Sequence, residues 1–195
     1  APQAVVNVEC SENVPPVPVQ TATDNCDAPV DLDYIEINTA GTCPNSYTLT
    51  RIWTAADACG NLTARQQVIN VSDTKAPVMH GLPTLATVNI ECSEDVPAVP
   101  TVTATDNCDV PVVLDFSEVE IPGTCTNQYS ITRTWSAQDD CGNATSFVQT
   151  INVNDTEAPA LAGLPADATV NIECSEDVPA VPTVTATDNC NAPIV

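Results

Sequence analysis

Aspartates that recur in loop motifs are the residues of this sequence best suited to chemistry. They stand before Asn-Cys, before Cys-Gly-Asn, and in a recurring Asp-Thr-x-Ala-Pro stretch. Calcium takes six to eight oxygens from carboxylates, amide side chains and backbone carbonyls. An aspartate of the Asp-Thr stretch, together with loop carboxylates of the neighbouring repeat, could supply such a set. The expected calcium ligands are Asp24, Asp57, Asp73, Asp106, Asp139, Asp155 and Asp188.

A second interpretation of the same aspartates stays open. Asp and Asn side chains accept hydrogen bonds from backbone amides two residues further on, and so close tight turns without any metal. None of the stretches has the spacing of an EF-hand loop. The sequence therefore predicts either a calcium site or turn-forming aspartates at these positions.

The ten cysteines are spaced too regularly and too widely for a zinc or redox motif. Within a repeat they are separated by 16, 17 and 16 residues, and His80 is the only histidine. An even number at regular spacing in an acidic chain predicts disulfides and an oxidising compartment. All ten are expected to be bonded: Cys10, Cys26, Cys43, Cys59, Cys92, Cys108, Cys125, Cys141, Cys174 and Cys190.

Four cysteines in a repeat allow three pairings, and spacing alone does not choose among them. Pairing the first with the second and the third with the fourth leaves no cysteine over in the shorter third repeat, so this pairing is favoured. It gives Cys10–Cys26, Cys43–Cys59, Cys92–Cys108, Cys125–Cys141 and Cys174–Cys190. Each bond would close a loop of about 17 residues, which stabilises the fold by roughly 3 kcal/mol in the chain-entropy treatment.

Composition argues against several classes of function. Acidic residues outnumber basic ones 26 to 4, for a net charge of −22, which disfavours nucleic acid and anionic lipid as partners. No apolar run is long enough to span a membrane. Nucleophile elbows, phosphate-binding loops and metalloprotease motifs do not occur, so the chain is not expected to be an enzyme.

These residues are positioned by a sequence repeat with a period of 82 residues. Val6–Cys10 returns as Val88–Cys92 and as Val170–Cys174. A domain-sized period predicts modules in tandem. The expected boundaries are residues 1–75, 76–157 and 158–195, the last being the truncated start of a third module in what we expect to be a longer chain. A Gly-Leu-Pro stretch, present at 81–83 and 163–165, is missing from the first copy.

Alternation of apolar and polar residues between proline-rich breaks predicts an all-β module. In residues 47–55, Tyr47, Leu49, Arg51, Trp53 and Ala55 form one face and the threonines the other. The first face should point inward. Further strands are expected at 4–9, 30–37 and 64–71, and about seven short strands per module would make an antiparallel β-sandwich.

The tryptophans and arginines of this inner face raise two separate questions. Trp53 and Trp135 are expected in the core, with exposed ligand stacking as the alternative. Arg51 and Arg133 should be paired or stacked if they are buried, with Asp33 or Asp115 as possible partners. Alternatively, each arginine extends along the edge of the sandwich.

The linked motifs T-A-T-D-N-C, Y-x-[LI]-T-R-x-W, D-x-C-G-N and D-T-x-A-P resemble the hyalin-repeat-like modules of secreted surface adhesins from Bacteroidota-type bacteria. This resemblance covers nearly the whole chain. It implies disulfide-stapled, immunoglobulin-like sandwiches in tandem, an extracellular or cell-surface location and an adhesive or structural role. It brings no catalytic residues.

Repeats joined by short, proline-bearing linkers favour a structural segment of an extracellular filament, stalk or adhesin shaft. Its partners would then be further copies of the module, in the same chain or in neighbouring chains. Two alternatives remain: an array of modules that bind surface glycans or proteins, and a subunit of a polymer held together by strand exchange.

Overall fold

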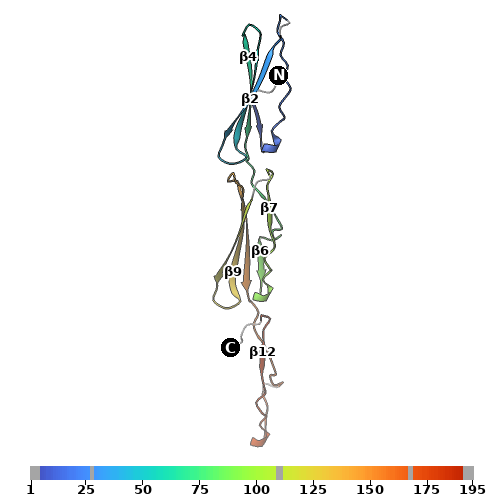
Figure 1. Ribbon diagram of the computed structural model, residues 1–195. Coiled ribbons are helices and arrows are strands. Elements are labelled where there is room, and N and C mark those ends of the chain that lie inside the picture. The colour runs from blue at the N-terminus through green and yellow to red at the C-terminus, as the bar shows by residue number, and fades with distance from the viewer. Residues whose placement is uncertain (1–4, 27–28, 109–111, 167–168, 191–195) are drawn as a thin grey trace. The chain divides into compact units, whose positions relative to one another are not determined.

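The structure is a computed structural model that describes residues 5–26, 29–108, 112–166 and 169–190. Over these residues the secondary structure is strands and three single-turn 3-10 segments, η1 (Ser11–Asn13), η2 (Ser93–Asp95) and η3 (Ser175–Asp177). The chain is all-β with several sheets, consistent with an immunoglobulin-like sandwich, as expected from the sequence (Figure 1).

The first repeat forms a four-stranded sheet from β1 (Val5–Val8), β2 (Asp31–Ala40), β3 (Tyr47–Ala56) and β4 (Leu62–Val71), in the order β1-β4-β3-β2. The last three strands are joined by hairpins and are antiparallel. β1 pairs in parallel with β4, so the chain must run back along the sheet before β2 can begin. Ala4, part of the strand expected at 4–9, lies outside the described residues.

The return run is the proline-rich segment that follows η1. Pro15, Pro16 and Pro18 cannot donate to a ladder, and they keep this segment extended without strand pairing. Val14 at its start packs against the core cluster of Leu49, Ile69 and Val71. Part of the module is thus an unpaired extended segment, and the described residues of each repeat form fewer strands than the seven expected.

The predicted inner face of β3 is confirmed. Leu49, Arg51, Trp53 and Ala55 are buried, while the threonines between them are half-buried. β2, at the edge of the sheet, is exposed along its whole length. The core is therefore narrow and is concentrated where β1, β3 and β4 meet.

The second repeat forms the same sheet from β6 (Thr87–Ile90), β8 (Val113–Pro122), β9 (Gln128–Gln138) and β10 (Ala144–Asn154), in the order β6-β10-β9-β8. Its core is the equivalent cluster of Ile131, Ile151 and Val153. The predicted inner face is again confirmed, since Ile131, Arg133, Trp135 and Ala137 are buried.

Two short antiparallel sheets complete the structure. β5 (Val78–His80) pairs with β7 (Thr103–Thr105), and β11 (Ala160–Ala162) pairs with β12 (Thr185–Thr187). The strand equivalent to β7 in the first repeat would be Thr21–Thr23, but these residues pair with no described strand.

The chain divides into two compact units that do not coincide with the repeats. Unit 1 contains Ala1–Leu82, Thr101–Asp115 and Trp135–Ser146, and unit 2 contains Pro83–Pro100, Phe116–Thr134 and Phe147–Val195. Segments of the second repeat are therefore part of the same compact unit as the whole first repeat.

The two ends of each sheet differ in the loops and turns that they carry. We call the end where β4 stops and the chain leaves the repeat the tail end, and the opposite end, where β3 turns into β4, the head end. In the first repeat, η1 and the β2–β3 hairpin turn lie at the tail end, and the β3–β4 turn lies at the head end (Figure 1).

Candidate functional site: a disulfide-bonded junction with paired aspartates

Three disulfides join each repeat to the next one along the chain. They are Cys10–Cys108, Cys43–Cys141 and Cys92–Cys190, with Cα–Cα distances of 5.2, 5.1 and 5.0 Å. Each spans 98 residues, which is the repeat period of 82 plus the 16-residue spacing between neighbouring cysteines. The favoured pairing within each repeat, such as Cys10–Cys26 and Cys43–Cys59, is therefore wrong.

The geometry of the strands explains the correction. Cys10 follows β1 and lies at the tail end, whereas Cys26 comes after the extended proline-rich run and lies at the head end. Cys43 and Cys59 are separated in the same way by the ten residues of β3. Because a strand rises about 3.3 Å per residue, cysteines at opposite ends of a sheet cannot bond.

Four cysteines expected in disulfides are free and exposed among the described residues, namely Cys26, Cys59, Cys125 and Cys174. Cys26 and Cys59 occupy the head end of the first repeat, at positions equivalent to the bonded Cys108 and Cys141 of the second. Cys125 and Cys174 occupy tail-end positions equivalent to Cys43 and to Cys10. Each free cysteine therefore occupies the same position in its repeat, at the head end or the tail end, as a bonded cysteine of another repeat.

Polar contacts surround the first junction. The Asn45 side chain accepts a hydrogen bond from the Ser11 amide at 3.1 Å and donates to the Cys108 carbonyl at 3.4 Å. The Thr74 hydroxyl donates to Glu9 at 2.9 Å. Asn143 donates through Nδ2 to the Asp73 carbonyl at 3.2 Å. These contacts position the Asp73 stretch against the loops of the second repeat.

Two of the predicted calcium ligands meet at this junction. A carboxylate oxygen of Asp73, one of Asp106 and the Cys108 sulfur lie within 4.8 Å of one another. Cys108 is held in a disulfide, so only the carboxylates remain as strong ligands. In both aspartates Oδ1 accepts a backbone amide hydrogen bond, from Lys75 and Cys108 respectively, while Oδ2 is buried without any hydrogen-bond partner.

Buried carboxylate oxygens without donors are costly, because burial removes water that would otherwise solvate the charge. Desolvation raises the pKa of Asp73, and the charges of Asp106, Asp139 and Glu9 raise it further. A cation between Asp73 and Asp106 would satisfy both oxygens. The cluster can therefore hold a metal ion.

The same pair recurs one repeat later. Oxygens of Asp155 and Asp188 lie within 4.8 Å of one another and of the Cys190 sulfur. Their Oδ1 atoms again accept amide hydrogen bonds, from Glu157 and Cys190. Because this pairing of aspartates occurs at both junctions, it is a feature of how one repeat meets the next.

The remaining predicted ligands close turns. Asp139 uses Oδ1 to accept the amides of Cys141 and Asn143 and Oδ2 to accept the Asn143 side chain. Asp57 makes the equivalent bonds with Cys59 and Asn61, and hydrogen bonds from Asn61 lower its pKa. Asp24 accepts the Cys26 amide at 3.2 Å. Turn-closing hydrogen bonds are thus present at these three aspartates, and among the described residues the two clusters that could hold a metal ion are confined to the junction aspartates and their partners.

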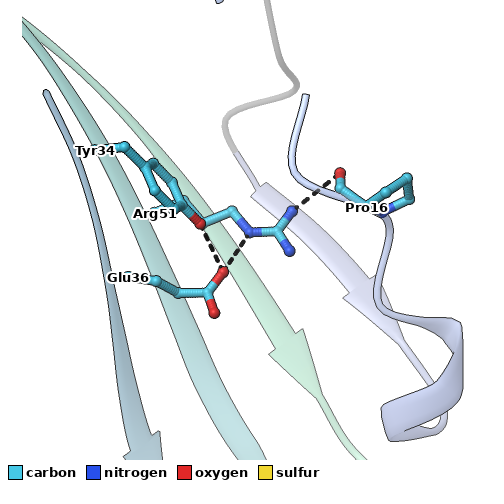
Figure 2. Close-up of polar contacts among 4 residues, drawn as sticks. All are labelled: Pro16, Tyr34, Glu36 and Arg51. Carbon is cyan, nitrogen blue, oxygen red and sulfur yellow. Dashed lines mark hydrogen bonds and ion pairs between the residues drawn. The ribbon is translucent and has the colours of Figure 1, made fainter. Parts of the chain in front are cut away.

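Arg51 lies on the inner face and is 3% exposed. Its Nε donates to Glu36 at 2.8 Å and its Nη1 to the Pro16 carbonyl at 3.4 Å, and Figure 2 shows both contacts. The Tyr34 hydroxyl donates to the same Glu36 at 2.7 Å. Hydrogen bonds from Arg51 and then Tyr34 hold the pKa of Glu36 below its usual value.

The second repeat reproduces this arrangement, with Arg133 bonded to Glu118 at 2.7 Å and to the Pro97 carbonyl at 2.8 Å. The arginine partners are therefore Glu36 and Glu118, not Asp33 and Asp115. Asp33 pairs with Thr54 in the register and so lies on the opposite face of the sheet from Arg51. By donating to a proline carbonyl, each arginine connects the proline-rich segment to the sheet.

The tryptophans are core residues, as expected, and do not form an exposed stacking surface. Trp53 is 6% and Trp135 is 2% exposed. The Trp53 ring lies 5.4 Å from that of Tyr34. The alternative of ligand stacking on these rings is therefore wrong.

Comparison with known proteins supports one family. Residues 81–153 match the family described as HYR-like domain with 4 cysteines, which supports a hyalin-repeat-like family for this part of the chain. No curated protein matches the sequence. Over the described residues, none of the helical segments has the length or apolar character needed to cross a membrane. The match and the disulfides together suggest an extracellular repeat or adhesion module.

Proposed function

We propose that this chain is a structural segment of a filament, stalk or adhesin shaft on the surface of a Bacteroidota-type bacterium. The observation that carries the proposal is the covalent connection from each repeat to the next through disulfides 98 residues apart. A bond within the repeat would also stabilise the folded module, but it would leave the junction between two repeats free to bend. Bonds between repeats instead fix the junction.

The connectivity has a direct mechanical consequence. A force applied at Cys10 passes through the first disulfide to Cys108, back along the chain to Cys92, and through the next disulfide to Cys190. Only the 16 residues between Cys92 and Cys108 lie on this path. Fully stretched, they span at most about 58 Å, against about 650 Å for the 180 residues from 10 to 190 without disulfides.

Single-molecule pulling from the two ends of the described chain tests the proposal. The oxidised chain should extend by no more than several tens of ångströms beyond its folded length, and a reduced sample of the same chain should release several hundred. A long extension of the oxidised chain at low force would refute a shaft role. The binding-array alternative is less well supported, because the tryptophans that suggested it are buried.

We further propose that calcium binds between Asp73 and Asp106 and between Asp155 and Asp188. The unpartnered, buried Oδ2 atoms of Asp73 and Asp106 support this proposal, since calcium prefers carboxylate oxygens. Binding only to the folded state would stabilise it by about 2.7 kcal/mol when free calcium is about a hundredfold above Kd.

The test compares melting temperatures with calcium and with a chelator for the native chain and two matched variants. Asp106→Asn removes one of the two proposed sites and should reduce the calcium-dependent shift, while the site at Asp155 and Asp188 remains. Asp24→Asn changes the equivalent aspartate of the first repeat, which has no described partner aspartate, and should leave the shift intact. Equal melting curves for the native chain with and without calcium would leave the aspartates as turn formers.

A further inference from the structure

The head end of the first repeat carries a set of groups whose equivalents further along the described chain are engaged. Thr21–Thr23 is equivalent to β7 and to β12 but pairs with no described strand. Cys26 and Cys59 are equivalent to bonded cysteines but are free. Asp24 is equivalent to Asp106 and Asp188, each of which faces an aspartate from the preceding repeat.

A cavity of about 380 Å³ lies at the same place. Its lining includes Thr21–Thr23, Asp24, Asp57 and Asn61, with Leu62 and Thr63 from the start of β4. The equivalent of Asn61 in the second repeat, Asn143, holds the Asp73 carbonyl. An accessible groove thus occurs where the second repeat receives the Asp73 stretch.

We propose that this head end is a socket that receives the tail end of another module of the same type, by strand pairing and by two disulfides. The first junction of this chain shows what the occupant looks like. It is an Asp-Thr-x-Ala-Pro peptide followed by a three-residue strand, and it comes with a module whose two tail-end cysteines, Cys10 and Cys43, bond to Cys108 and Cys141 of the next repeat. This inference rests on the proposed function, because it names the partner that extends the shaft.

The filled junction defines the recognition chemistry. Val78, Met79 and His80 pair with Thr105, Ala104 and Thr103, and the His80 ring lies 2.9 Å from the Thr105 hydroxyl. Gly81 then adopts φ +81°, and a Cβ there would lie 2.6 Å from the Thr101 carbonyl oxygen. Gly163 repeats this approach against Thr183. An occupant therefore needs a strand followed by glycine.

The covalent step joins the Cys26 thiol to a tail-end thiol equivalent to Cys10, and Cys59 to one equivalent to Cys43. Each new S–S bond releases two protons and two electrons. A disulfide-bonded thiol oxidoreductase of the oxidising compartment accepts the electrons and becomes a dithiol. The exposure of Cys26 and Cys59 leaves both accessible to this exchange.

The first test adds a synthetic peptide of residues 72–82 to the full chain. At about ten times its Kd, the peptide should slow hydrogen exchange at Thr21–Thr23 and maleimide labelling of Cys26 by about tenfold. The control is the same peptide with Gly81→Val, which should bind at least tenfold more weakly. Equal effects of the two peptides, or no protection at Thr21–Thr23, would contradict strand pairing in the socket.

The second test supplies a whole partner module. A copy of residues 76–169 replaces residues 1–5, so that its last residue leads into Val6 at the spacing found before Val170. After oxidation, mass spectrometry should find Cys26 bonded to the added copy of Cys92, and Cys59 to the added copy of Cys125. The three native disulfides report whether the extended chain has folded.

If those three form while Cys26 and Cys59 stay as thiols or bond to each other, the socket is refuted. That outcome would not refute the proposed shaft function, because the pulling experiment depends only on the three disulfides already present in the chain. Conversely, a filled socket in a chain that extends easily under force would refute the shaft and keep the socket.

Discussion

Removing one disulfide between repeats should cost more stability than a bond within a repeat could supply. In the variant Cys43→Ser/Cys141→Ser, neither partner is left as a free thiol. The Cys10–Cys108 bond remains, so the loop that opens consists of residues 10–43 and 108–141. Each arm has 33 residues, giving a loop of about 66.

The chain-entropy relation gives about 4 kcal/mol for a loop of about 66 residues, against about 3 kcal/mol for one of about 17. Urea unfolding followed through tryptophan fluorescence should show this loss in the double variant. Cys59→Ser, which removes a free and exposed cysteine, should change the free energy of unfolding by less than about 0.5 kcal/mol.

Thiol counts check the connectivity independently of the energies. The described cysteines predict four reactive thiols in the native chain, five in Cys43→Ser and three in Cys59→Ser. Pairing within the repeat would give none in the native chain and one in each variant. A native count of zero, or a Cys59→Ser variant as destabilised as Cys43→Ser/Cys141→Ser, would refute the assignment of disulfides between repeats.

Three further predictions concern the module itself. Hydrogen bonding from Arg51 lowers the pKa of Glu36 in the folded chain, so the ionised Glu36 stabilises the fold above the usual carboxyl pKa, and this stabilisation is lost as pH falls through the lower pKa of the folded state. The variant Glu36→Gln should therefore flatten that part of a plot of unfolding free energy against pH. Asn45→Ala leaves the Ser11 amide and the Cys108 carbonyl without their partner and should cost about 1–3 kcal/mol in urea unfolding, with no change in the disulfides. Ile69→Ala, at a site with no exposed surface, should cost about 2–5 kcal/mol, whereas Val19→Ala, at a site 94% exposed, should have almost no effect.

Features that depend on the local alternation of apolar and polar residues are predicted correctly from the sequence. The inner faces of β3 and β9 follow from a period of two, because successive side chains of a strand point to opposite faces. The sequence also predicts that Asp73 lies near loop carboxylates of the next repeat, because the Asp-Thr stretch stands at the boundary between the two repeats. In both cases the prediction needs only residues that are near one another in the sequence or that stand at a repeat boundary.

Features that depend on register were predicted less well. Asp33 pairs with Thr54 and so lies on the opposite face of the sheet from Arg51, whereas Glu36 stands directly opposite Arg51 on the same face. Choosing between them requires knowing which residue of β2 stands opposite which residue of β3. That register is set by the hairpin around residues 41–46, and its composition alone does not reveal the offset.

The cysteine spacing itself contains a signal against disulfides between cysteines that are neighbours in the sequence. A spacing of 16 or 17 residues equals one crossing of the module, since a ten-residue strand and its turn take about that length. Successive cysteines must then alternate between the tail end and the head end, and no two neighbours along the sequence can meet. Two arrangements that preserve the repeat are then left: bonds between the two cysteines at one end of a module, such as Cys10 with Cys43, and bonds that run forward by one period plus one spacing, such as Cys10–Cys108. The structure has the second arrangement, which connects each repeat covalently to the next, and the spacing alone does not choose between the two.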